Sequence, residues 1–221
     1  MRFGIAGEGV TDFYVLESLL IGFFNDKNLP VTRFRPKQQE PFGFGNLMNY
    51  LSSEDFKIDV ESIDFTLVQI DTKECADWNP SINNIGDDDT QVAAFIEQVR
   101  TFLIDKIGID FYEEFQDRII FAITVHEIEC WLLPFHITTL AHQRKMVGCL
   151  GTLENIANTK GISINQKNFQ QGKHYEDFSK PLKKKKDLLQ KAKLNPSLNI
   201  FIQYLQTKFL NENSTREAES Q

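Results

Sequence analysis

The chain has 221 residues, a formal net charge of −7, 41% hydrophobic residues and 19 phenylalanines. This composition supports a packed core, which excludes a wholly disordered chain, and the negative charge argues against a protein that coats nucleic acid non-specifically. No apolar run reaches the roughly 18 residues that span a bilayer, and the N-terminal segment lacks a secretory signal, so we expect a cytoplasmic protein without a membrane partner.

Short apolar runs predict strands, and apolar residues three or four apart predict helices. In chain order these patterns predict a strand at residues 2–6, a helix at 11–25, a strand at 31–35, a short helix at 46–51, a strand at 63–70, a helix at 91–107, a strand at 118–125, and helices at 127–133, 178–191 and 196–210. Strands that alternate with helices indicate an α/β fold, here a mostly parallel four-stranded sheet flanked by helices with a C-terminal helical extension.

Changes in composition divide the chain into three parts. We expect an α/β domain at residues 1–149, a helical extension at 150–210 that packs on the same domain, and a disordered tail at 211–221, where apolar side chains are scarce. Residues 71–90 are predicted to form a long loop, and loops of this length are usually functional or mobile.

Carboxylates follow three of the predicted strands. Glu8 lies in a Gly-Glu-Gly turn after the first strand, Asp71 follows the third, and Glu127 and Glu129 follow the fourth. In a parallel sheet these strand ends open onto the same edge, where such sheets bind ligands. Carboxylates gathered there repel one another unless protons or hard cations lie between them, which indicates a magnesium-type site and phosphate chemistry.

The glycine-rich turn around Glu8 fits neither a dinucleotide-binding motif nor a P-loop. Glu8 would also repel a bare phosphate, whereas a cation between the two removes that conflict. Simpler interpretations stay open: Glu8 as an acid at a helix start, and Asp71 as a turn residue. Glu127 and Glu129 are two residues apart, so on a helix at most one of them would reach the crevice.

Three cysteines, Cys75, Cys130 and Cys149, are odd in number and far apart in the sequence, so they do not indicate a disulfide framework and suit a reducing compartment. His126 and Cys130 have a spacing that would suit zinc on a helix, but no third ligand is evident. We therefore interpret Cys130, which precedes Trp131, as a buried apolar residue.

Basic residues concentrate between positions 180 and 193. They form either the solvated face of a helix, which is the more common outcome for a charge run, or a strip that contacts phosphates. The candidate nucleic-acid contacts are Lys173, Lys180, Lys183 and Lys184.

Three segments resemble motifs of a known family. The run from Gly7 to Asp12 resembles the glutamate-glycine motif of Toprim domains, Ile70-Asp71 resembles the strand-end aspartate of their second motif, and residues 125–133 are similar to the E-x-E-x-W-L-L segment of the Toprim-like family DUF4276, relatives of the OLD-family nucleases. The resemblance implies a Toprim fold, Mg²⁺ or Mn²⁺, and phosphodiester chemistry. It also implies that Glu8 is a metal ligand or general acid–base, Asp71 a metal ligand, and Glu129 or Glu127 a ligand of a second ion.

The second motif departs from the family pattern, because Lys73 stands where a second aspartate is usual. The lysine either contributes fixed positive charge to a phosphoryl transition state or indicates that catalysis has been lost. Glu74 or Asp77 would be the replacement for the missing carboxylate.

These observations predict a metal-dependent nuclease that acts on DNA or RNA. By resemblance, we expect a role in antiphage defence with a separate ABC-type or AAA-type ATPase, since the chain has no Walker motif of its own. The alternative is a Toprim scaffold that has lost catalysis and binds an ATPase complex as a regulatory module. A phosphatase or nucleotidyltransferase is a third candidate, and we also consider a homo-oligomer.

Overall fold

The protein is described by a computed structural model that covers residues 1–37, 40–41, 43–83, 85, 89–159 and 173–219, with the backbone alone for residues 173 and 210–219. Four strands form one fully parallel sheet in the order β2-β1-β3-β4. Their bounds are β1 Phe3–Ala6, β2 Val31–Arg35, β3 Phe65–Asp71 and β4 Ile119–Thr124. The predicted α/β class and the four predicted strands are therefore confirmed.

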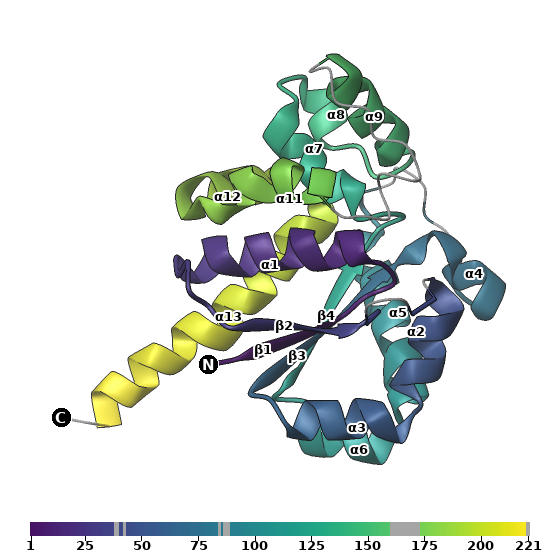
Figure 1. The fold of residues 1–221 in the computed structure, drawn as a ribbon, viewed down its shortest axis with the longest axis vertical. Helices are drawn as coiled ribbons and strands as arrows, with labels where there is room; N and C mark the ends of the chain where they lie inside the picture. The colour runs from purple at the N-terminus through teal and green to yellow at the C-terminus, as the bar shows by residue number, and fades with distance from the viewer. Residues whose placement is uncertain (38–39, 42, 84, 86–88, 160–172, 220–221) are drawn as a thin grey trace.

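The helices cover both faces of this sheet (Figure 1). Their bounds are α1 Val10–Phe24, α2 Phe44–Leu51, α3 Glu54–Glu61, α4 Cys75–Trp78, α5 Val92–Ile107, α6 Ile109–Phe115, α7 Glu129–His136, α8 Leu140–Gln143, α9 Cys149–Thr159, α11 Lys173–Ser179, α12 Lys185–Lys191 and α13 Pro196–Glu219. Three 3-10 turns join them: η1 Thr72–Glu74, η2 Lys180–Lys183 and η3 Ala192–Leu194.

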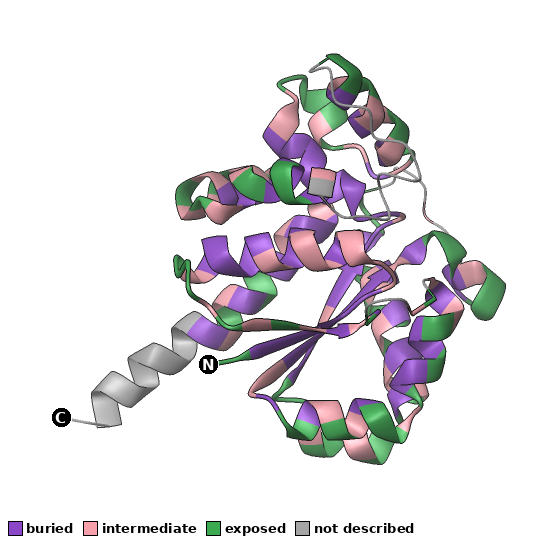
Figure 2. Ribbon diagram, in the orientation of Figure 1, coloured by how far each residue is buried: buried purple, intermediate pink, exposed green. Residues whose placement is uncertain are grey.

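Successive residues of each strand point to opposite faces, which creates two hydrophobic cores. Leu67 and Ile120 enter the core under α1, α7 and α13, whereas the neighbouring Val68 and Ile119 enter the core under α2, α3 and α5. Figure 2 shows the resulting buried central layer. Strands buried on both faces explain why the sequence carries continuous apolar runs there.

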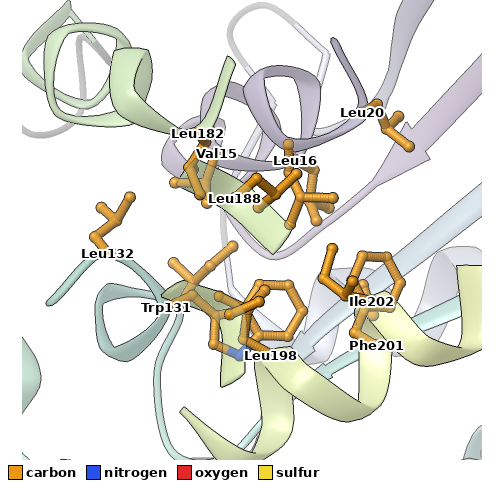
Figure 3. Packing of buried hydrophobic residues seen from close by; sticks show 14 of the residues in the cluster. Val15, Leu16, Leu20, Trp131, Leu132, Leu182, Leu188, Leu198, Phe201 and Ile202 are labelled. Atoms are coloured by element: carbon orange, nitrogen blue, oxygen red, sulfur yellow. The ribbon is translucent and has the colours of Figure 1, made fainter. Parts of the chain in front are cut away.

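Trp131 anchors the first core, as its apolar sequence context predicts. Its indole is fully buried, stacks on Phe201 with ring centroids 5.2 Å apart, and donates a 2.8 Å hydrogen bond from Nε1 to Ser197 Oγ. Figure 3 shows it among side chains of α1, α12 and α13, including Leu16 and Leu198. This packing fixes α7, and with it the start of that helix at Glu129.

Several boundaries differ from the sequence-based expectation. The predicted helix at 178–191 is interrupted by η2, which contains Pro181, because proline lacks the amide hydrogen that a continuous helix needs. Helix α13 extends through Glu219, where the sequence predicts disorder from residue 211. The predicted loop at 71–90 begins with η1 and α4, and α9 lies in a segment for which the sequence analysis predicts no helix.

The expectation of no disulfide is wrong. Cys130 at the start of α7 and Cys149 at the start of α9 are bonded through sulfur atoms 2.08 Å apart, and both residues are fully buried. The chain folds back through α8 between them, which brings residues 19 apart in sequence together. Cys75 is a buried free cysteine. Since disulfides are typical of oxidising compartments, the cysteines no longer support a reducing one.

Across the described part of the chain, no helix has both the length and the apolar character required to cross a membrane.

Candidate functional site

Glu8 and Asp71 meet at the carboxyl edge of the sheet. The register pairs Ala6 of β1 with Val68 of β3, so Glu8 lies beside the end of β3. The Glu8 Oε1 atom accepts a 2.8 Å hydrogen bond from the backbone N–H of Asp71. Burial raises the pKa of Glu8 well above its usual value, and repulsion from Asp71 and Asp12 adds to the shift.

Asp71, the last residue of β3, is held by two side chains. Its Oδ1 atom accepts hydrogen bonds from Thr124 Oγ1 at 2.7 Å and from Gln69 Nε2 at 2.8 Å. Burial followed by repulsion from Asp12 raises the pKa of Asp71 to about 8. Thr124 is paired with Asp71 in the strand register, so the sheet itself positions this donor.

Asp12 is a third carboxylate of the cluster that the sequence analysis does not predict as a site residue. Its side chain is 4% exposed and accepts hydrogen bonds from Gly9 N at 2.6 Å and Thr11 Oγ1 at 3.2 Å. Burial and then repulsion from Glu129 raise its pKa to about 7. The position of Asp12 in the first turn of α1 suggests a capping role, so the sequence alone does not indicate that its side chain faces the cluster. Its spacing of four residues from Glu8 is the sequence signal that would have indicated it.

Glu129, the first residue of α7, completes the cluster. It is 5% exposed, and its Oε1 atom accepts a 2.5 Å hydrogen bond from the hydroxyl of Tyr175, a fully buried residue of α11. Burial and repulsion from Asp71 raise the pKa of Glu129 to about 8. Tyr175 lies 46 residues away in the sequence, and no local pattern predicts its role as a donor to this carboxylate.

Glu127 and Glu129 have different hydrogen-bond partners. The Glu127 Oε1 atom accepts a 2.7 Å hydrogen bond from the backbone N–H of Leu150, in the first turn of α9. This agrees with the expectation that the two carboxylates diverge. The charge of Glu127 still acts on Asp71 and Glu129. Glu127 is therefore a neighbour of the cluster that is engaged by α9.

Lys73 contributes positive charge next to these carboxylates. Its backbone N–H donates to His126 O at 3.2 Å, and Thr72 Oγ1 accepts from His126 N at 2.8 Å, so the segments after β3 and β4 are joined. Lys73 is exposed to solvent. Partial desolvation lowers the pKa of its ammonium group, but the negative charges, Asp71 first among them, outweigh this effect and raise the pKa. Asp77, a predicted ligand, is exposed on α4 instead of being buried with the cluster.

Gln69 gives the cluster an unsatisfied oxygen. Its side chain is fully buried, and its Oε1 atom has no hydrogen-bond partner among the described residues. Gln69 Oε1 and Asp12 Oδ2 lie 3.2 and 3.3 Å from the point where a Cβ atom on Gly7 would stand, so the two oxygens converge beside that glycine. Carboxylate and amide oxygens are the kind of donor that Mg²⁺ and Mn²⁺ prefer. Among the described residues, however, the one group of three or more acidic, thiol or imidazole side chains close enough to hold an ion is Glu127, Cys130 and Cys149, so the carboxylates of the cluster would have to draw together around a cation.

A cavity of about 220 Å³ opens beside Glu8. Gly7, Glu8 and Arg35 contribute to its wall. Arg35 is fixed there, because its guanidinium lies 4.4 Å from the centroid of the Tyr50 ring and forms a 3.0 Å ion pair with Asp55. Glu8 thus lies at the boundary between the buried carboxylates and a space that a substrate group can enter.

The predicted basic contacts do not join the cluster. The η2 turn packs against the second half of α1 near Gly22, about 15 Å along the helix from Asp12 at 1.5 Å per residue. Lys180 forms a 2.5 Å ion pair with Asp177, and the charge of Lys183 acts on Glu17. Lys184 is exposed. The Lys173 side chain lies outside the described residues.

No protein-family model, curated protein or solved structure matches the chain at a significant level. The resemblance to Toprim domains therefore stays a prediction based on short motifs, and the chemistry of the site has to be argued from its geometry.

Proposed function

We propose that this protein is a divalent-metal-dependent nuclease that hydrolyses phosphodiester bonds. The observation that carries the proposal is the convergence of Glu8, Asp12, Asp71 and Glu129 at the carboxyl edge of three parallel strands. Carboxylates gathered in a site of this kind are unfavourable unless protons, a positive side chain such as Lys73 or a cation compensates their charge, and we propose a bound cation as the compensation in the active protein.

Glu8, Asp12 and Asp71, together with the free oxygen of Gln69, are the groups that would hold Mg²⁺ or Mn²⁺. When bound, the cation supplies positive charge for the transferring phosphoryl group and for activation of water. Thr124, Gly9 N and Tyr175 each fix one carboxylate oxygen, so these donors orient the ligands before substrate arrives.

The alternative role for Glu8 is that of general acid–base, with Asp12, Asp71 and Gln69 left to hold the cation. The Glu8 Oε1 atom is fixed by the Asp71 amide, and the position of Glu8 beside the cavity allows Oε2 to exchange a proton with a group in that space. The raised pKa of Glu8 favours the protonated form, which can donate a proton to a group in that space. Lys73 adds a permanent positive charge to the same environment, which would partly neutralise a substrate phosphate.

A catalytically inactive scaffold that regulates an ATPase complex is the second candidate. The position of Lys73 favours it, since a lysine cannot bind a cation where an aspartate would. Calorimetry discriminates between the two functions: the scaffold predicts no Mg²⁺ or Mn²⁺ binding that depends on Glu8 and Asp71.

The nuclease proposal is tested with panels of DNA and RNA, single- and double-stranded, in Mg²⁺, Mn²⁺ or EDTA. We expect cation-dependent cleavage that is abolished in Glu8→Gln and Asp71→Asn and retained in the matched surface variant Asp77→Asn. Equal cleavage by the wild type and Glu8→Gln would contradict the assignment. Phosphorylated metabolites in the same assay test for a phosphatase or nucleotidyltransferase.

The separate ATPase partner and the role in antiphage defence are proposed from the motif resemblance alone. A nuclease held inactive until a partner is engaged would show weak cleavage by itself. Metal binding should therefore be measured alongside cleavage, because it does not require the partner.

A further inference from the structure

A second group of ligands lies outside the carboxylate cluster. Cys130 Sγ, Cys149 Sγ and one carboxylate oxygen of Glu127 all lie within 4.8 Å of one another. Thiolates and a carboxylate are ligands that Zn²⁺ accepts, whereas Mg²⁺ prefers oxygen alone. We propose that Cys130, Cys149 and Glu127 form a thiol-based site for Zn²⁺ when the disulfide is reduced.

Both cysteines lie in the first turn of a helix. Cys130 is the second residue of α7 and Cys149 is the first residue of α9. The N-terminal end of a helix carries partial positive charge, which stabilises a thiolate over a thiol. The site therefore receives two negatively charged sulfur ligands from two helices.

Glu127 supplies the third ligand with a fixed orientation. Its Oε1 atom accepts the 2.7 Å hydrogen bond from Leu150 N, the residue after Cys149, so the carboxylate and that cysteine belong to one local arrangement. Glu127 is 9% exposed and is the most accessible of the three residues. Three protein ligands leave a fourth coordination position for a water molecule. The sequence analysis excluded zinc at Cys130 for want of a third ligand, and the return of the chain at α9 provides it.

The disulfide and the zinc site exclude each other. A phosphine reductant breaks the bond between the two sulfur atoms, adds two electrons, and is itself converted to the phosphine oxide with an oxygen from water. The two sulfurs then take up protons, and Zn²⁺ releases those protons on binding. The proposal does not depend on the nuclease function, because none of its ligands is assigned to hold the catalytic cation.

Co²⁺ is the probe, since thiolate–cobalt bonds produce a near-ultraviolet charge-transfer band. The full chain is reduced with a phosphine, the phosphine is removed under argon, and Co²⁺ is added. We expect one Co²⁺ per chain, displaced by Zn²⁺, with the band absent from Cys130→Ser, Cys149→Ser and the unreduced protein. Glu127→Gln should weaken Co²⁺ binding by about tenfold or more. Cys75→Ala and Glu8→Gln are matched controls that should retain the band.

A second measurement uses the wild type alone and does not rely on variants that fold. Reduced wild-type protein should retain about one more equivalent of Zn²⁺ through dialysis than the unreduced protein does. No charge-transfer band in the reduced wild type, or the same amount of retained Zn²⁺ before and after reduction, overturns the proposal. A band that persists in both serine variants also overturns it.

Discussion

Replacing Asp71 by asparagine should stabilise the metal-free protein at alkaline pH. Asparagine has the shape of aspartate, and its Oδ1 atom can still accept from Thr124 and Gln69, so the hydrogen bonds survive while the charge is lost. Most substitutions at a buried hydrogen-bonded residue destabilise a protein. A gain in stability would therefore be a specific signature of charge repulsion within the cluster.

The sign follows from the direction of the pKa shift. The folded state raises the pKa of Asp71 from 3.8 to about 8, so the folded protein binds the proton more tightly than the unfolded chain. Below about pH 4 both states are protonated and the group has no effect on stability. As the pH rises from there to about 8, the unfolded chain ionises freely and the free energy of unfolding falls.

The size of the effect follows from the same shift. Four pH units correspond to about 5 to 6 kcal/mol for a group that titrates alone, at about 1.4 kcal/mol per unit. Asp12 and Glu127 repel Asp71 in the same titration, so part of that energy belongs to the neighbours. We expect Asp71→Asn to raise the free energy of unfolding by about 2 to 4 kcal/mol near pH 8 and by much less near pH 5.

The assay is urea unfolding in EDTA, without reductant so that the Cys130–Cys149 bond stays intact. Asp64→Asn is the control of opposite sign, because a hydrogen bond from Arg2 lowers the pKa of that surface carboxyl group and its removal should slightly destabilise. Excess Mg²⁺ should stabilise the wild type and not Asp71→Asn. The reasoning fails if Asp71→Asn is destabilised equally near pH 5 and pH 8, or if wild-type stability does not fall across that range.

Three further predictions concern other parts of the structure. Tyr175→Phe removes the donor to Glu129 and should cost about 1 to 3 kcal/mol of unfolding free energy, more near pH 9 than near pH 6, by urea unfolding. Gly22→Ala places a Cβ atom 1.9 Å from a backbone carbonyl oxygen of η2, so it should lower the free energy of unfolding by about 1 to 3 kcal/mol in thermal unfolding. The matched variant Gly151→Ala in α9 meets open space and should raise the free energy of unfolding by about 0.5 to 1 kcal/mol. Asp77→Asn should leave the stabilisation by Mg²⁺ unchanged in a thermal shift assay, since this exposed carboxylate is not buried with the cluster.

Strand pattern and parallel topology were enough to predict which segments form the sheet and that Glu8 and Asp71 meet at one edge. Both conclusions depend on local periodicity and on a general rule about parallel strands. The remaining parts of the site depend on tertiary packing. Tyr175 reaches Glu129 only because α11 packs beside α1, and Gln69 appears in the sequence as an ordinary residue within a strand.

The disulfide likewise depends on tertiary packing that the sequence pattern does not indicate. Spacing along the chain argued against a bond between Cys130 and Cys149, but the distance that matters is between their Cα atoms, which are 5.1 Å apart. That proximity is set by the return of the chain through α8 to α9. The buried positions of α9, Cys149, Leu153 and Ala157, follow a helical spacing, but the direction in which the chain returns depends on tertiary packing. A cysteine count therefore constrains the number of bonds without locating them.

The energetic cost of the cluster is itself an argument about function. Asp12, Asp71 and Glu129 have pKa values of about 7 to 8, so each favours the neutral form in the folded protein. A scaffold without a ligand would become more stable if any of them were replaced by a neutral isostere, whereas the proposed cation site needs Asp12 and Asp71. Lys73 offsets part of the repulsion, while Gln69 Oε1 stays without a hydrogen-bond partner among the described residues. The pH dependence of the stabilisation by Mg²⁺ separates the two cases. In a cation site, the increase in unfolding free energy on adding Mg²⁺ should grow steeply between about pH 5 and 8, because protons leave the carboxylates. In an inactive scaffold, Mg²⁺ should have no such pH-dependent effect.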